Sequence, residues 1–306
     1  MQKQLPIIND GDSIVPYKKA MEANMKKFGK ILVAVLMLAT LVGACFAFTA
    51  CNNDGAKDTL IVATNCEFEP FEYLDDNGNP VGIDMDIAAA IANELGLKLQ
   101  IKDMAFDSVV GSVASGACDI AIAGLTVTEE RKQSVNFTQT YFSSSQVVIA
   151  KNGDAILDVT VSDPENEDEV AAAIAQIESM LNGKRVGVQN GTTGYSYVSG
   201  DSDDYEGVAG ATAVGFPSGA LAVQAMLNGN VDYVIIDMVP ASKLAAANQG
   251  VSVSEVVLTG EDYAFGIAKN NSDLLNKVNA ALDKLIKNGT IEQIFQKYGY
   301  SSGLGE

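Results

Sequence analysis

Two segments of the chain share one pattern of apolar and polar positions. GACDIAIAG (116–124) and GNVDYVIID (229–237) each begin with Gly, place Asp three residues later and continue through four mostly apolar residues. Each follows an apolar segment with helical spacing, DSVVGSVAS (107–115) and SGALAVQAMLN (218–228). A helix, a glycine turn and a buried strand form the repeating unit of an α/β sheet. Because ligands bind outside the carboxyl ends of such strands, the repeat predicts two α/β lobes that face one site.

The rest of the pattern predicts further strands and helices in alternation. We expect strands over 60–65, 97–104, 143–151 and 263–271 and helices over 82–96, 239–250 and, in two parts divided at Gly289, 274–299. Asp107 is a candidate N-cap for the helix that follows it, and Gly96 is a candidate C-cap for the helix 82–96. Residues 154–182 look like a surface insertion, since an acidic run leads into an amphipathic helix over 169–181.

Composition removes several classes of function. The chain has 306 residues, with 20 Lys and Arg against 39 Asp and Glu, which gives a formal charge of −19. Such an acidic protein is not expected to bind nucleic acid, which requires a basic face. The chain has no His, and this excludes a Ser-His-Asp triad and a His-ligated metal site. We expect no metal and no cofactor.

The four cysteines fall into two pairs of different character. Cys45 and Cys51 lie in or just after an apolar N-terminal segment, whereas Cys66 and Cys118 lie further along the chain without metal-like spacing. Cys66 follows a predicted strand and Cys118 precedes one. Opposite edges of a sheet are too far apart for a disulfide, so we expect two separate, buried thiols.

The N-terminal segment has the pattern of a secretory signal. MKKFGK (25–30) is basic and ILVAVLMLATLVGACFAFTAC (31–51) is apolar, so Met25 is a candidate start. A membrane-spanning helix is the alternative, since the apolar run approaches the length required. Bacterial lipoprotein signals end in a small residue followed by a Cys that becomes lipidated. The polar sequence NNDGAKD after Cys51 favours that residue over Cys45, and either one predicts a lipid-anchored protein.

Two charged side chains are candidates for binding a small ligand. Arg131 lies in a polar segment after a buried strand, beside Thr126 and Thr128, where its guanidinium could bind a carboxylate. An ion pair with Glu129 or Glu130 is the alternative. Asp237 ends the apolar run VDYVII, where its carboxylate could bind an ammonium group. A helix N-cap is the alternative for Asp237.

A glycine turn and a group of aromatic residues are weaker candidates. NGTTG (190–194) follows a predicted strand and begins a helix, so its N–H groups could bind a small anion. It lacks the spacing of a nucleotide-binding loop, and an ordinary strand–helix turn is the alternative. Phe68, Phe71, Tyr73 and Phe106 could form the walls of a slot, although aromatic residues in loops usually pack inward. Together, the guanidinium and the carboxylate facing across a cleft predict a receptor for an amino-acid zwitterion.

At this point a family resemblance is evident. The sequence resembles the polar amino-acid-binding proteins of bacterial ABC importers, which are extracellular solute-binding lipoproteins of family 3. The motifs that carry the resemblance cover nearly all of residues 58–300, in the family's order: ATNCEFEPFEY (63–73), GIDMDIAAAIANELG (82–96), FDSVVGSVASG (106–116), AGLTVTEERKQSVNFTQTY (123–141), GKRVGVQNGTTG (183–194), NGNVDYVIID (228–237) and DKLIKNGTIEQIFQKYG (283–299).

The resemblance implies an α/β protein with the type II periplasmic-binding-protein fold. In that fold two α/β lobes are joined by two crossing strands, and a ligand cleft lies between them. Lobe 1 would comprise 58–143 and 262–300, and lobe 2 would comprise 144–261 with the insertion at about 154–182. Residues 1–50 would be the N-terminal extension and signal peptide, and 51–57 a tether.

The resemblance also implies roles for individual residues. Arg131 would bind the α-carboxylate with Thr126 and the N–H groups near Thr192 and Thr193, and Asp237 would bind the α-ammonium with the Gly124 carbonyl. Phe68 and Phe106 would enclose the ligand side chain. The same family site includes Leu125, and Asn65, Glu67, Gln146 and Gln189 would line the end that selects the side chain. Several relatives have Asp where this chain has Asn65, which argues against a lysine or arginine ligand, although Glu67 could compensate.

The implied function is capture of an amino acid and its delivery to a membrane permease with a cytoplasmic ATPase. The implied protein is a monomer, anchored by its N-terminal lipid to the outer face of the cell membrane. An enzyme on the same fold, a dehydratase acting on a small carboxylic acid, is the alternative. It would need a general acid or base in the cleft. A sensor ectodomain is a further possibility and would need a separate signalling partner.

Overall fold

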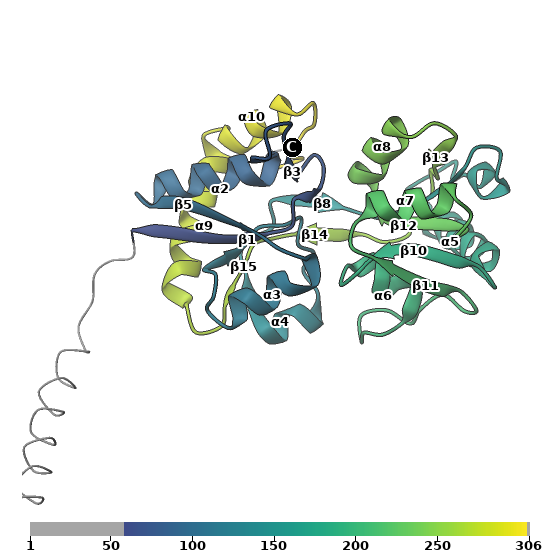
Figure 1. Ribbon diagram of the computed structural model, residues 1–306, viewed down its shortest axis with the longest axis horizontal. Coiled ribbons are helices and arrows are strands. Elements are labelled where there is room, and N and C mark those ends of the chain that lie inside the picture. Colours follow the sequence, from purple (N-terminus) through teal and green to yellow (C-terminus); the bar gives the residue numbers. More distant parts are fainter. Residues whose placement is uncertain (1–57, 305–306) are drawn as a thin grey trace, which may run out of the picture. The chain divides into compact units, whose positions relative to one another are not determined.

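The computed structural model describes residues 58–304. Within this range the chain forms two five-stranded sheets, each covered by helices on both faces (Figure 1). The predicted signal peptide, the predicted tether and the lipidation candidates Cys45 and Cys51 lie outside the described residues. In the described part, no helix is both long enough and apolar enough to cross a membrane.

The first sheet has the strand order β5-β1-β6-β15-β7. Its strands are β1 (Thr59–Thr64), β5 (Lys98–Asp103), β6 (Ile120–Ala121), β7 (Val135–Phe137) and β15 (Gly266–Ala268). β1 runs parallel to both β5 and β6, whereas β15 is antiparallel to β6 and β7. Because β15 comes from the C-terminal part of the chain, this sheet is assembled from two distant segments.

Helices cover both faces of the first sheet, and alternation along the strands explains why. Val62 and Ile120 point to the face covered by α2, α9 and α10, while Ala63 and Ala121 point to the face covered by α3. Strands buried on both sides read as continuous apolar runs, as LIVA and IAIA do here. The helices are α2 (Ile83–Glu94), α3 (Phe106–Ala114), α4 (Glu129–Ser134), α9 (Ser272–Lys287) and α10 (Thr290–Lys297). This sheet and its helices are called the first lobe below.

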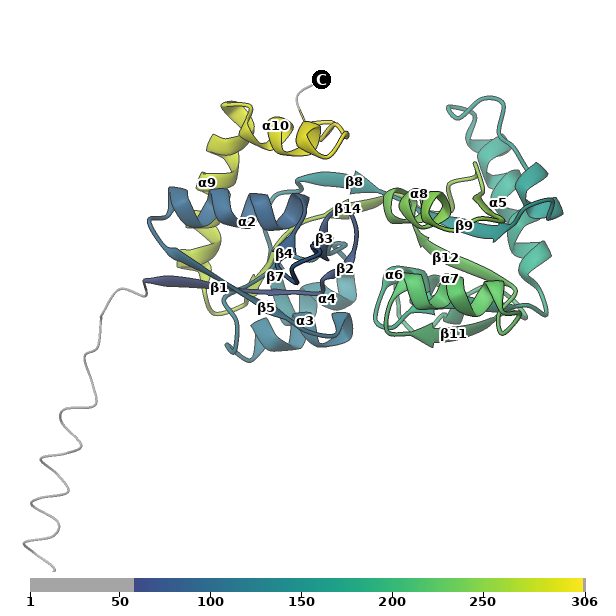
Figure 2. The same ribbon diagram turned by 45° about the horizontal axis from the view of Figure 1, so that its top comes forward.

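The second sheet has the order β11-β10-β12-β9-β13 and is built in the same way. Its strands are β9 (Gln146–Lys151), β10 (Arg185–Gln189), β11 (Thr212–Phe216), β12 (Tyr233–Asp237) and β13 (Val251–Val253). Its helices are α5 (Glu167–Leu181), α6 (Thr193–Ser199), α7 (Gly219–Leu227) and α8 (Met238–Ala247), with a 3-10 turn, η1 (Ala155–Asp158). Figure 2 shows α7 alongside this sheet. This second sheet and its helices are called the second lobe below.

Two crossing strands and a small sheet complete the fold. β8 (Phe142–Ser144) pairs antiparallel with β14 (Glu261–Tyr263), and these two strands lead from one lobe to the other. The small sheet contains β2 (Glu67–Phe68), β3 (Glu72–Leu74) and β4 (Pro80–Val81). The fold class expected from the sequence, two α/β lobes joined by crossing strands, is confirmed. The residue boundaries given for the lobes stay a prediction.

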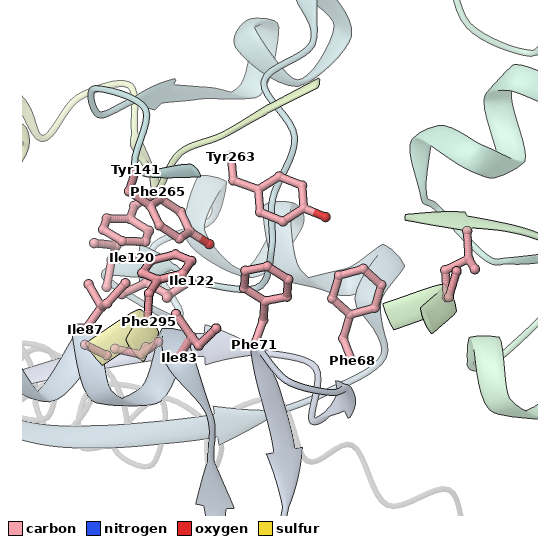
Figure 3. Close-up of a cluster of buried hydrophobic side chains, with 14 of the residues drawn as sticks. Phe68, Phe71, Ile83, Ile87, Ile120, Ile122, Tyr141, Tyr263, Phe265 and Phe295 are labelled. Atoms are coloured by element: carbon pink, nitrogen blue, oxygen red, sulfur yellow. The ribbon is translucent and has the colours of Figure 1, made fainter. Parts of the chain in front are cut away.

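An aromatic cluster fixes the first lobe to the crossing strands. Phe71 has its ring 5.3 Å from Tyr263 and 5.2 Å from Phe142, and Tyr141 stacks on Phe265 at 4.5 Å. Figure 3 shows this cluster, with the Tyr263 hydroxyl pointing out of it. Phe71 is fully buried, so it belongs to the core and does not line a slot. Ring pairs of this kind stabilise a fold beyond the area that they bury.

Two buried carboxyl groups lie beneath this cluster. Asp84 accepts hydrogen bonds from the Gly124 N–H (2.8 Å) and the Tyr141 hydroxyl (2.7 Å). Glu72 is fully buried, and neither of its carboxyl oxygens has a hydrogen-bond donor among the described residues. A buried carboxylate without donors, close to a second acid, is strongly disfavoured. Burial, followed by the charge of Asp84, raises the pKa of Glu72 well above its usual value, so Glu72 carries the proton.

Most predicted elements are confirmed, with three differences. Asp107 is not the N-cap of α3, because the helix begins one residue earlier and Ala105 occupies the N-cap position. The segment 143–151 divides into the end of β8 and β9, and the segment 263–271 divides into the end of β14 and β15. Both divisions occur where the chain passes from a crossing strand into a sheet.

Three other sequence predictions are confirmed. Gly96 follows the end of α2 with a φ of 66°, as a C-terminal glycine should. The insertion helix α5 buries Ala173, Ile177 and Leu181 on one face. Cys66 and Cys118 are both free and buried. Burial, with a smaller contribution from Asp103, raises the pKa of Cys66 to about 12, so this thiol is unreactive at neutral pH.

The neutral state of Glu72 predicts an unusual pH dependence of stability. A group whose folded pKa is raised stabilises the fold below its unfolded pKa of 4.5, and this contribution is lost as pH rises. Glu72→Gln keeps a hydrogen-bond donor beside Asp84 and cannot ionise. Its free energy of unfolding relative to wild type should therefore rise with pH above about pH 5, by at most about 1.4 kcal/mol per pH unit, measured by urea unfolding.

The matched control is Glu67→Gln on the neighbouring strand β2, where the side chain is exposed. This variant should follow the wild-type pH profile throughout. Parallel stability curves for wild type and Glu72→Gln would show that Glu72 is ionised in the fold.

Candidate functional site

A small cavity lies at the carboxyl ends of the strands from both sheets. Its volume is ≈ 10 Å³, which is about the space of one water molecule. Its lining brings together most of the residues predicted from the sequence: Phe68, Phe106, Gly124, Thr126, Arg131, Gln189, Thr192, Thr193 and Asp237. Residues more than a hundred positions apart in the chain therefore meet at one point.

Asn65 and Leu125 do not line this cavity. Leu125 is 1% exposed and belongs to the core of the first lobe. Asn65 lies one hydrogen bond away, because its Oδ1 accepts from Nε2 of Gln189 at 2.8 Å. Glu67 lies in a different groove with Cys66 and Lys243. Gln146 is buried behind the cavity and donates to Asp237.

Arg131 reaches the cavity from α4 of the first lobe. The hydroxyl of Thr128 caps this short helix by accepting from the Arg131 N–H. The guanidinium donates to the Thr126 carbonyl at 2.7 Å and to the Gly191 carbonyl at 3.0 Å, and it lies 5.4 Å from the centre of the Phe106 ring. Burial lowers the pKa of Arg131 from its usual value, although a guanidinium remains charged at neutral pH.

The alternative of an ion pair between Arg131 and a neighbouring glutamate does not fit these contacts. Glu129 instead pairs with Lys132 at 2.7 Å. Two of the five guanidinium N–H donors of Arg131 bind backbone carbonyls. This arrangement holds the planar group in place while leaving its charge available to a small anion.

Gly191 explains the glycine of the NGTTG motif. It has a φ of 74°, and a Cβ atom at this position would lie 2.9 Å from the backbone of Asp107 in the other lobe. Any other residue would therefore push α3 away. Thr192 is the N-cap of α6 and accepts from the Tyr195 N–H. The motif thus provides both a close approach between lobes and a helix N-terminus beside the cavity.

Asp237 occupies the cavity end of β12 in the second lobe. It is 5% exposed and accepts hydrogen bonds from Tyr263, Gln146 and Ser144. Asp237 occupies the N-cap position of α8, as the alternative predicts, but its side chain makes no capping hydrogen bond. Burial and then the nearby charge of Glu261 raise the pKa of Asp237 to about 7.

Glu261 is a site residue that sequence reasoning missed. It begins β14, it is 6% exposed, and its Oε2 atom accepts from Thr126 (2.8 Å) and Thr193 (3.0 Å). Thr259 and Tyr205 donate to its other oxygen at 3.2 and 3.3 Å. In the sequence Glu261 is one acid beside another in GEDYAF, a pattern typical of a solvated turn. Only the pairing of β14 with β8 turns it inward.

Hydrogen bonds of the Asn65 amide fix the orientation of the Gln189 amide, which lines the cavity. Asn65 donates through Nδ2 to the Met104 carbonyl at 2.8 Å, which directs its Oδ1 toward Gln189. Gln189 must then donate through Nε2, so its Oε1 faces the other way. That oxygen is buried and has no hydrogen-bond partner among the described residues. These two hydrogen bonds therefore leave Oε1 of the cavity-lining residue Gln189 as a neutral acceptor without a partner among the described residues.

The residues described between 58 and 304 include no group of three or more acidic or cysteine side chains arranged to hold a metal ion. The lining of the cavity instead combines one guanidinium, one carboxylate, three threonines and two aromatic rings. A second carboxylate, that of Glu261, does not line the cavity but is bonded to two of these threonines, Thr126 and Thr193. Such a site can bind a small molecule that carries both a carboxylate and an ammonium group.

Comparison with known proteins places this site in a family. The chain matches the bacterial extracellular solute-binding proteins, family 3, over residues 60–301. It is 28% identical to a probable histidine-binding protein of Neisseria gonorrhoeae, with 92% of this chain and 98% of that protein covered. Its fold is also similar to solved structures.

Two of these structures are ancestral arginine-binding proteins. The one bound to arginine has a TM-score of 0.68 and 36% identity, covering 79% of this chain and 99% of the other. The one bound to glutamine has a TM-score of 0.67 and 35% identity, with coverage of 79% and 98%. Since the family match spans nearly all the described residues and the two-lobed fold agrees, this chain belongs to the bacterial extracellular solute-binding proteins of family 3.

Proposed function

We propose that this protein captures one amino acid between its two lobes, through the α-carboxylate and α-ammonium groups, and delivers it to an ABC importer. The observation that carries the proposal is the placement of Arg131 and Asp237, from different lobes, on one cavity. Relatives named for binding histidine and arginine support an amino acid as the solute.

The α-carboxylate binds at Arg131 in this proposal. Arg131 lines the cavity, and so do Thr192 and Thr193 at the N-terminus of α6. Helix N-termini and guanidinium groups both favour anions, and burial strengthens this attraction because water screens it less.

The α-ammonium binds at Asp237. Its two oxygens accept three hydrogen bonds from Tyr263, Ser144 and Gln146, whereas a carboxylate offers about four acceptor positions. One position therefore remains for a ligand N–H, and the three protein donors hold the carboxylate in place. The Gly124 carbonyl, at the end of the strand opposite, is the second ammonium acceptor in this proposal.

The ligand side chain meets Gln189. The unpartnered Oε1 of Gln189 favours a side chain with an N–H donor, and the rings of Phe68 and Phe106 provide apolar walls for its stem. A buried acceptor without a partner disfavours binding of side chains that cannot donate. The site therefore selects donors such as the amide of glutamine or the guanidinium of arginine and excludes glutamate.

Ligand entry requires the lobes to separate. A volume of ≈ 10 Å³ cannot accommodate an amino acid, so the crossing strands β8 and β14 must bend for a ligand to enter. Contacts from both lobes then favour the closed arrangement, as expected when a ligand selects one of two conformations.

The protein is a binding protein and not an enzyme. The relatives compared above are named for the amino acids that they bind. The alternative of a cleft dehydratase gains no support from them.

Lipid anchoring and a monomeric state remain predictions from the sequence. In the proposed arrangement the lipid on Cys51 keeps the protein at the outer face of the membrane, near the permease that receives the ligand. The polar sequence after Cys51 is the tether that allows the lobes to reach it.

Arg131→Ala tests the carboxylate site. The loss of a buried charged partner typically costs about 2–5 kcal/mol, so affinity for L-glutamine and L-arginine should fall by about 30-fold or more in isothermal titration. Lys132→Ala on the same helix is the matched control, since Lys132 is exposed and pairs only with Glu129. Normal affinity in a folded Arg131→Ala protein would remove Arg131 from the site.

A thermal-shift screen of the full chain, refolded to remove bound solute, tests the ligand class. A ligand that binds only the folded state raises the melting temperature. We expect shifts with glutamine or arginine and none with glutamate. Gln189→Met should reduce these shifts, because a hydrogen bond of about 1–3 kcal/mol is lost.

Gln224→Met is the control for this substitution, because Gln224 is an exposed amide in α7. It should leave every shift unchanged. A strong shift with glutamate in the wild-type protein would contradict the assigned orientation of Gln189.

Cys51→Ser tests the anchor. Without the lipidated thiol the protein should move from the detergent phase to the aqueous phase in detergent partitioning, since a lipid chain supplies the membrane affinity. Cys45→Ser should remain in the detergent phase. If Cys45→Ser moved to the aqueous phase and Cys51→Ser stayed in the detergent phase, Cys45 would be the lipidated residue. A wild-type protein in the aqueous phase would exclude the anchor.

A further inference from the structure

The centre of the site contains more negative charge than an amino-acid zwitterion needs. Asp237 and Glu261 are both buried, and both accept hydrogen bonds from the Nε2 atom of Gln146, at 2.8 and 3.4 Å. An amino acid bound by Arg131 and Asp237 leaves the second carboxylate, Glu261, without a matching charge. A buried, uncompensated charge is costly.

Glu261 also occupies a special position between the lobes. Its Oε2 atom accepts from the hydroxyl of Thr126, which follows β6 of the first lobe, and from the hydroxyl of Thr193 in α6 of the second. One carboxylate oxygen therefore joins the cleft-facing ends of both lobes. The crossing strand β14 supplies this carboxylate, so the contact lies at the hinge itself.

The charged and titratable groups around this carboxylate pair come from several elements. Arg131 of α4 is the cation, and it acts more strongly on Glu261 than on Asp237. Tyr263 of β14 donates to Asp237, and Tyr205 donates to Glu261. The pKa values of both tyrosines are raised, first by burial, so they remain neutral donors. Glu72, further away, is also protonated.

One cation thus faces two carboxylates. Desolvation raises the pKa of Asp237 to about 7, and the charge of Glu261 is the second cause. Near neutral pH Asp237 is therefore protonated in part of the population. A ligand ammonium cannot bind a protonated Asp237, so it must displace that proton.

We propose that Glu261 is a positioning residue of the binding site, which holds Thr126 and Thr193 together across the cleft and couples ligand binding to the release of a proton. This inference rests on the function proposed above. The released proton goes to solvent, and the ligand ammonium takes its place on Asp237. The site then holds two cationic groups, Arg131 and the ligand ammonium, against Asp237, Glu261 and the ligand carboxylate.

The pH dependence of affinity tests the proposal. Between pH 6 and pH 8 neither L-glutamine nor L-arginine titrates, so any change in affinity comes from the protein. An essential carboxylate with a pKa of about 7 should make binding by the full wild-type chain about tenfold weaker at pH 6 than at pH 8. Titrations at pH 7 in phosphate and in Tris, which differ in ionisation enthalpy, should report proton release.

Glu261→Gln keeps the size of the side chain and removes its charge. The pKa of Asp237 should fall, so the change in affinity between pH 6 and pH 8 should shrink to less than about threefold and proton release should decrease. Loss of a purely structural contact would lower affinity equally at every pH. Asp262→Asn is the matched control, because Asp262 is the exposed neighbour on the same strand and bonds to Ser143.

The outcomes separate this inference from the function on which it rests. A wild-type protein that binds neither amino acid overturns the proposed function, and the inference with it. A wild-type protein that binds with equal affinity at pH 6 and pH 8 and without proton release overturns the role of Glu261 alone, whether or not the variant folds. An unchanged pH profile in folded Glu261→Gln overturns it as well.

Discussion

The hydrogen bonds of buried Asp84 fix the framework on which the site depends. Its carboxylate, carried by α2, holds the Gly124 N–H at the end of one strand and the Tyr141 hydroxyl just before β8. The strand end that lines the cavity and the strand that crosses to the other lobe are therefore tied to one point. The protonated Glu72 beside it spares the core a second charge, which would be costly at this depth. The aromatic rings around Phe71 then exclude water from both acids.

The cavity differs from the core around Asp84, because its charged side chains are buried without complete compensation by protein groups. Among the described residues, Arg131 donates to the carbonyls of Thr126 and Gly191, and the nearby Asp237 accepts from neutral donors. Neither charge is neutralised by direct contact with the other. Low local polarity strengthens every interaction with a ligand, and a zwitterion bound as proposed supplies the opposite charge for each of these two groups. In this proposal the charges, and not the shape of the cavity alone, select the ligand.

The sequence predicts the strands and their ends well, but it does not predict which distant side chains join them. Arg131, Asp237 and the NGTTG motif follow buried strands, and strand ends in α/β sheets lie at one edge. The structure places all three on the cavity. Leu125 lies in the same motif as Thr126 but points into the core, because successive residues of extended chain face opposite sides. The sequence could not indicate which of these two residues, Leu125 or Thr126, would face the cavity and which would face the core.

Other features of the site depend on contacts between residues far apart in the chain, and no local sequence pattern predicts them. Asp107 looked like an N-cap because acidic residues favour helix starts, yet a first-turn position satisfies the same electrostatics. Glu261 stands beside Asp262 in a sequence typical of a solvated turn, and only its register opposite Ser144 in β8 turns it toward the cleft. Gly191 is required by the approach of Asp107 from the other lobe. Such constraints arise when two lobes meet, so they cannot be read from either segment alone.

The crossing strands are themselves part of the proposed binding site. Glu261 and Tyr263 are two residues apart on β14, so they face the same side, and both contact the carboxylate cluster, while Asp262 between them is exposed. Ser144 of β8 contributes a third contact to Asp237. A ligand bound to Asp237, as proposed, would therefore act directly on residues of the crossing strands β8 and β14. Opening and binding need no intervening chain of residues to be coupled, because the hinge and the site share the same side chains.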